Sequence, residues 1–169
     1  MTARQATLAH EAGHVVGGLL AGHRIETVRL GPTETEPRNS GTTTFDWAQS
    51  PDVDLFGHLV AVLMGPMAAG GQPPVWPPLP DLDGNDDEHV VLRLVSHLKL
   101  TKPEYMAAVA LAAHWLDDPL VKAAISKLAH ALGQTGSLTD AQVRDVLGTG
   151  LVEWLELADP PRQSEERVA

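Results

Sequence analysis

Two histidines four residues apart lie near the start of the chain, in the run His10-Glu11-Ala12-Gly13-His14. On a helix, residues four apart lie one turn above each other, so both imidazoles project from one face and can bind one tetrahedral zinc ion. Zinc lowers the pKa of a bound water toward ~7, and a carboxylate beside it can take the proton as the water attacks a carbonyl. The spacing therefore predicts zinc ligands at His10 and His14 and a general base at Glu11.

A third protein ligand is expected, because a catalytic zinc ion keeps one position for water and takes three ligands from the protein. The acidic run that opens the third expected helix contains Asp86 and Asp87. Asp87 shares a helical face with the apolar Val91 and Leu94, whereas Asp86 shares its face with Arg93. Acidic residues at a helix start also act as caps. Periodicity favours Asp87 as the ligand, with Asp86 as the alternative.

Other catalytic classes lack their residues. The metzincin pattern needs a third histidine where Leu20 stands, and the chain contains no phosphate loop of an ATPase. The remaining histidines show no second ligand spacing, so we expect surface or partly buried positions for His23, His58, His89, His97, His114 and His130.

Hydrophobic periodicity and turn residues predict a mostly α fold with a small β element. Capping signals mark three later helix starts: Thr101 with Glu104, Asp118 before Pro119, and Thr139 with Gln142. The helix that starts at Asp118 is expected to run to about Leu132, before Gly133. The earlier elements are predicted as a helix over 6–21 ending at Gly22, strands over 25–30 and 41–47, a helix from Pro51 to about Gly70, a proline-rich loop over 72–83 and a helix ending at Leu98.

Length and composition indicate a single domain. We expect a zinc metallopeptidase-like domain over residues 1–158 of the 169, with a disordered tail over 159–169. The absence of cysteine excludes thiol nucleophiles and cysteine zinc clusters. A net charge of −10 opposes binding to nucleic acid or an acidic membrane surface. No span or secretory signal is evident, so a cytoplasmic location without membrane contact is expected.

Several segments resemble one family of zinc proteases in the same order along the chain. They are 8–16, 28–32, 41–43, 59–69, 128–132, 136–139 and 143–147. Together they are similar to the peptidase domain of the FtsH family, the ATP-dependent zinc metalloproteases, over about residues 6–148. The resemblance implies an FtsH peptidase-domain-like helical fold and the hydrolysis of peptide bonds by a Glu-activated, zinc-bound water.

The resemblance also bears on the third ligand and the partners. In that family the third ligand is an Asp at the start of a helix, often after Asn, which implies Asp86 or Asp87 here. The family's ATPase module and membrane helices have no counterpart in this sequence, and Gly70 stands where the family has Glu. The expected substrate is therefore a peptide or an unfolded protein segment, delivered within a homo-oligomer or by a separate ATPase partner. The alternative is a non-catalytic binding or regulatory module that is similar to the FtsH peptidase domain and retains the fold, with or without the metal.

Overall fold

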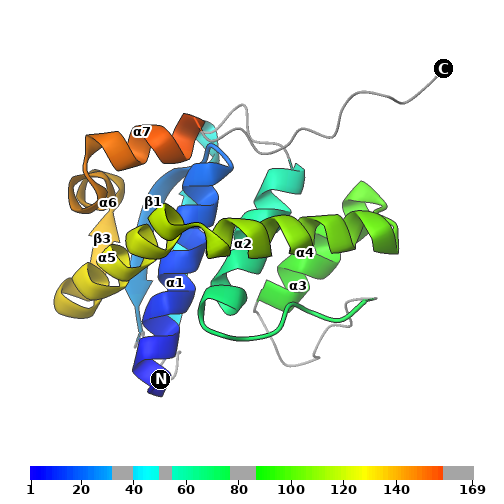
Figure 1. Cartoon of the computed structure of the whole chain (residues 1–169), viewed down its shortest axis with the longest axis horizontal. Helices are drawn as coiled ribbons and strands as arrows, with labels where there is room; N and C mark the ends of the chain where they lie inside the picture. Colours follow the sequence, from blue (N-terminus) through cyan, green and yellow to red (C-terminus); the bar gives the residue numbers. More distant parts are fainter. Residues whose placement is uncertain (32–39, 50–54, 77–86, 158–169) are drawn as a thin grey trace.

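The computed structural model describes residues 1–31, 40–49, 55–76 and 87–157. These residues form a mostly helical domain with a small antiparallel sheet, which confirms the predicted fold class at this level (Figure 1). The elements are α1 (Ala3–Leu20), β1 (Arg24–Leu30), β2 (Gly41–Asp46), the 3-10 helix η1 (Trp47–Gln49), α2 (Leu55–Ala68), α3 (Asp87–Leu98), α4 (Lys102–Asp117), α5 (Pro119–Thr135), β3 (Ser137–Thr139), α6 (Asp140–Leu147) and α7 (Thr149–Leu157).

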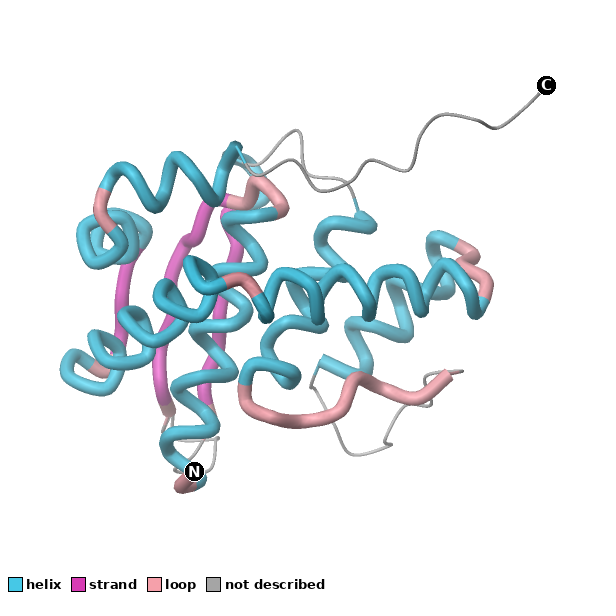
Figure 2. The backbone as a smooth tube through the Cα atoms, in the orientation of Figure 1, coloured by secondary structure: helices cyan, strands magenta, loops and turns pink. Residues whose placement is uncertain are grey.

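Helix α1 is the centre of the domain. It contacts α2, α5, α7 and the strands β1 and β2 (Figure 2), and every residue from Glu11 to Leu20 is buried. Two glycines on α1 allow α2 to approach closely. A Cβ at Gly13 would lie 2.7 Å from the carbonyl oxygen of Met64, and one at Gly17 would lie 2.8 Å from the Cα of Ala61. This close contact holds the histidine-bearing turn of α1 against α2.

The sheet has the order β2-β1-β3, so β1 is its central strand. Val28 of β1 pairs with Thr43 on one side and with Leu138 on the other. Alternate residues of a strand face the same side of a sheet. Gly41 and Phe45 of β2 both face α1, since a Cβ at Gly41 would meet Glu11 and the Phe45 ring fills the space beside Gly18. One face of β2 therefore lies along α1.

The predicted caps of three helices are confirmed. The backbone N–H of Thr101 donates to Glu104 at 2.7 Å, and that of Thr139 donates to Gln142 at 2.9 Å. The carboxylate of Asp118 accepts from the N–H of Leu120 at 2.7 Å. Each of these signals lies within a few residues of sequence, which explains why the sequence alone was sufficient.

The predicted end of α5 is wrong. The helix continues through Gly133 to Thr135, and the left-handed Gly136, with φ of 78°, caps it. A Cβ at Gly133 would lie 3.3 Å from a methyl group of Leu8, so the small residue at this position serves the packing of α5 on α1. Gly136 takes the terminating role because glycine adopts positive φ without strain.

Three short elements, η1, β3 and α7, were not predicted, and one strand is shorter than expected. The strand β3 contains only Ser137–Thr139, too few residues for an alternating pattern, and α7 buries Val152 and Leu155. Strand β2 ends at Asp46, and Trp47 begins η1. The predicted helix start at Pro51, Asp86, most of the proline-rich loop and the tail over 159–169 lie outside the described residues. None of the described helices combines the length and apolar character needed to cross a membrane.

Candidate metal centre

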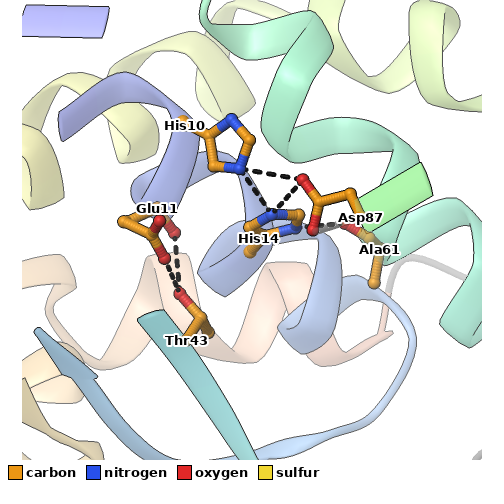
Figure 3. A network of polar contacts seen from close by, with 6 residues as sticks. All are labelled: His10, Glu11, His14, Thr43, Ala61 and Asp87. Carbon is orange, nitrogen blue, oxygen red and sulfur yellow. Dashed lines mark hydrogen bonds and ion pairs between the residues drawn. The ribbon is translucent and has the colours of Figure 1, made fainter. Parts of the chain in front are cut away.

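The structure brings His10, His14 and Asp87 together. Both histidines project from α1, and Asp87 is the first residue of α3 (Figure 3). Asp87 Oδ2 lies 2.9 Å from His10 Nε2 and 3.2 Å from His14 Nε2. The two Nε2 atoms are 3.0 Å apart. Three ligand atoms from two helices therefore form a nearly equilateral triangle.

This triangle fits a small tetrahedral ion. Bonds of about 2.0 to 2.1 Å to a tetrahedral zinc ion place its ligand atoms about 3.3 Å apart. The observed separations are 2.9 to 3.2 Å, so only a slight opening of the triangle is required. The side chains of His10 and Asp87 are 29% and 26% exposed, whereas that of His14 is 8% exposed. One side of the cluster is accessible from solvent.

Helix α2 fixes the orientation of His14. Nδ1 of His14 lies 3.1 Å from the carbonyl oxygen of Ala61. Because a carbonyl only accepts, Nδ1 carries the hydrogen, and in the neutral imidazole Nε2 keeps the lone pair that a metal requires. A Cβ at Gly65 would overlap the His14 ring, so glycine is needed there to admit it.

The electrostatics of the cluster favour a cation at its centre. Burial alone would lower the pKa of His14, but the hydrogen bond and negative charge of Asp87 outweigh this and raise the pKa. Burial opposes ionisation of Asp87, yet hydrogen bonds from His10 and His14 hold its pKa well below the usual range. An ionised carboxylate facing two imidazoles attracts positive charge, which either protons or a metal ion can supply.

Glu11 lies beside this cluster, on the same turn of α1. Glu11 is only 4% exposed to solvent. Its carboxylate accepts a hydrogen bond from Thr43 Oγ1 of β2 at 2.8 Å (Figure 3). Burial raises the pKa of Glu11, against the opposing effects of the positive charge on His14 and the hydrogen bond from Thr43. A raised pKa makes the carboxylate a better proton acceptor near neutral pH.

No protein-family model matches the chain. A search of curated proteins gives no match either. The interpretation of the cluster therefore depends on its own geometry. The expected ligands His10, His14 and Asp87 meet at one point, Glu11 lies next to them, and the alternative ligand Asp86 lies outside the described residues.

The prediction that all other histidines are surface or partly buried residues is wrong for His23 and His58. They are 1% and 9% exposed, and His23 Nε2 lies 3.0 Å from His58 Nδ1. Phe45 stacks on His23 at 4.4 Å between ring centroids, and Trp47 lies edge-on at 4.7 Å. Burial lowers the pKa of each imidazole to about 4, helped by His58 for the first and by His14 for the second.

The sequence also gave no role to Thr43. It is the middle residue of three consecutive threonines in β2. The signal that was available is the alternation of a strand, which places residue 43 on the same face as Gly41 and Phe45. Only the packing of β2 on α1 shows that this face meets Glu11.

Proposed function

We propose that this protein is a zinc-dependent metallopeptidase that hydrolyses peptide bonds in peptides or unfolded protein segments. The observation that carries the proposal is the convergence of His10 Nε2, His14 Nε2 and Asp87 Oδ2, partly open to solvent, with the Glu11 carboxylate on the same turn of α1. Two imidazoles and one carboxylate are the ligand set of many catalytic zinc sites, in which the fourth position stays open.

In this proposal, His10, His14 and Asp87 hold the ion and Glu11 moves the proton. Zinc, when bound, supplies a Lewis acid that polarises a carbonyl and favours ionisation of water. The water oxygen forms a bond to the peptide carbon, and the C–N bond breaks. Glu11 accepts the proton of the attacking water and donates it to the leaving amine nitrogen. His14 keeps its ring fixed through Ala61 during the reaction.

The substrate is proposed to lie in an extended conformation along β2. Within the described sheet, β2 pairs with β1 on one side only. An extended segment could add to its other edge by backbone hydrogen bonds, without a requirement for a particular sequence. Gly41 and Thr43 of β2 contact Glu11, so a segment bound there would pass near the general base.

The finer features of the proposal come from the resemblance to the FtsH family. They are an FtsH peptidase-domain-like fold and delivery of substrate within a homo-oligomer or by a separate ATPase, whereas a cytoplasmic location is proposed from the sequence alone. The order of the elements supports this fold: a helix that carries the two histidines is followed by two strands and further helices, with an aspartate at the start of α3. The net charge of −10 supports a protein substrate over nucleic acid.

Hydrolysis of unfolded casein tests the proposal. We expect the zinc-loaded wild-type protein to cleave casein and a chelator to abolish cleavage. Glu11→Gln should lower kcat by about 100- to 10,000-fold, because the general base is lost, while zinc affinity is kept. Glu153→Gln, at an exposed position on α7, is the matched control and should retain activity.

Two results would contradict the proposal. Full activity of Glu11→Gln would show that Glu11 is not the general base. Absence of cleavage by zinc-loaded wild-type protein on casein and short peptides would favour a non-catalytic module.

A further inference from the structure

Glu11 has a buried carboxylate that depends on strand β2 for its hydrogen bonding. Glu11 is 4% exposed to solvent, and Thr43 Oγ1 donates a hydrogen bond to Glu11 Oε2 at 2.8 Å. A buried carboxylate is costly unless donors compensate for lost water. The Thr43 hydroxyl also lies 3.4 Å from the backbone carbonyl oxygen of Glu11, so it sits directly against the residue.

Gly41 provides the space that the Glu11 side chain occupies. A Cβ at Gly41 would lie 2.5 Å from Cγ of Glu11 and 2.6 Å from Oε1. Residues 41 and 43 face the same side of β2, because alternate residues of a strand do. The carboxylate is therefore held between an open position at Gly41 and a donor at Thr43.

Both contacts act on Glu11 and neither involves a proposed zinc ligand. In the cluster of His10, His14 and Asp87, His14 Nδ1 donates a hydrogen bond to the carbonyl oxygen of Ala61 on α2, whereas Glu11 accepts one from Thr43 of β2 (Figure 3). The general base and the metal ligands thus have separate supports. A change in β2 should affect the first without affecting the second.

We propose that Thr43 is a positioning residue for the hydrolytic reaction, whose hydroxyl holds the Glu11 carboxylate in the place from which it exchanges protons with water and the leaving amine. This inference rests on the proposed function. It assigns to β2 the orientation of the general base, in addition to the binding of an extended substrate.

The neighbouring threonines provide matched controls. Thr42 and Thr44 belong to the same strand but point to its opposite face. Thr43→Val removes the hydroxyl with almost no change of shape, and Thr43→Ser restores a hydroxyl. Thr42→Val and Thr44→Val make the same chemical change away from Glu11. Thr43→Ala replaces Thr43→Val if the valine variant does not fold.

Crystal structures of the zinc-loaded variants test the positioning without any need for activity. We expect the Glu11 carboxylate to leave its place against Gly41 in Thr43→Val and to keep it in Thr43→Ser. An unmoved carboxylate in Thr43→Val would overturn the proposal. This readout still decides the matter if the wild-type protein hydrolyses nothing, in which case the proposed function fails separately.

Kinetics provide the second test. Loss of a hydrogen bond to a charged group predicts a fall in kcat of about 10- to 100-fold for Thr43→Val, with KM and zinc affinity within about twofold of the wild type. Thr43→Ser should recover most of kcat, and Thr42→Val and Thr44→Val, whose side chains lie on the face of β2 away from Glu11, should keep the wild-type kcat whatever their effect on KM. A wild-type kcat for Thr43→Val, or a Thr43→Ser as slow as Thr43→Val, would overturn the proposal.

Discussion

The protein contains two pairs of histidines whose ring nitrogens lie at the same separation in different surroundings. His10 and His14 have Nε2 atoms 3.0 Å apart, and His23 and His58 have nitrogens 3.0 Å apart as well. The first pair faces the carboxylate of Asp87 and is partly open to solvent. The second pair is enclosed by aromatic rings, and Nδ1 of His23 has no hydrogen-bond partner among the described residues.

The two environments shift the histidine pKa in opposite directions. Burial disfavours the charged imidazole in both pairs, but Asp87 reverses this effect at His14 and raises its pKa. No carboxylate of the described residues pairs with His23 or His58, and the pKa of each falls to about 4. The presence of a carboxylate and of access to solvent, rather than the proximity of two imidazoles, separates a candidate metal centre from a packed pair in the core.

Removal of one histidine from each pair should produce the largest difference in zinc affinity between two variants. His14→Ala should weaken zinc binding by more than about 100-fold, because a direct ligand is lost. His58→Ala should leave zinc affinity within about twofold, since His58 is not among the grouped ligands. Isothermal titration with zinc measures both, with circular dichroism to verify folding. Equal losses in the two variants would show that the pairs are not functionally distinct.

Removal of the carboxylate should have the next largest effect. Asp87→Ala should weaken zinc binding by at least about 10- to 100-fold, because it makes the first pair resemble the second. Glu88→Ala is the matched control, since Glu88 is the exposed next residue of α3. Zinc titration of both variants provides the measurement. An unchanged affinity for Asp87→Ala would transfer the ligand role to Asp86.

The second pair should make the fold sensitive to acid. The pKa of each imidazole is about 4 in the folded protein against 6.5 for the free group. As the pH falls from about 6.5 to about 4, the unfolded chain takes up protons that the folded protein does not. The free energy of unfolding therefore decreases in this window, by up to about 1.4 kcal/mol per pH unit for each group. Above about pH 6.5, both imidazoles are neutral in the folded and in the unfolded protein, so their contribution to the free energy of unfolding no longer changes with pH.

Urea unfolding of the zinc-free protein at several pH values measures this effect. The double variant His23→Leu/His58→Leu should show a shallower loss of stability over the same window. His114→Leu is a control on α4, outside the pair. An unchanged slope in the double variant would mean that the pair does not remain neutral in the folded protein.

The parts of the fold that the sequence predicted depend on neighbouring residues. The helix caps at Thr101 and Thr139 each join two residues that are three apart in sequence. The run from His10 to His14 spans one helical turn. The apolar register of α3 favoured Asp87, which forms the triangle of ligand atoms with both histidines. Local patterns were sufficient for the caps and the histidine pair because helix geometry determines which residues three or four apart meet, and for Asp87 they indicated only which face of α3 it occupies.

The parts that the sequence did not predict depend on distant contacts. His23 and His58 are 35 residues apart, and no spacing rule connects them. Glycine is typical of a helix end, but Gly133 lies within α5, where the absence of a side chain lets the helix pack against Leu8 of α1. Thr43 acquires its role only because β2 lies along α1 at Glu11.

The position of zinc in a crystal of the wild-type protein tests the central claim most directly. Anomalous diffraction at the zinc absorption edge, from crystals grown with one equivalent of zinc, identifies the ion without reference to activity. We expect one peak, bounded by His10, His14 and Asp87 and next to Glu11. A peak between His23 and His58, or no peak at the first pair, would contradict the assignment of the metal centre.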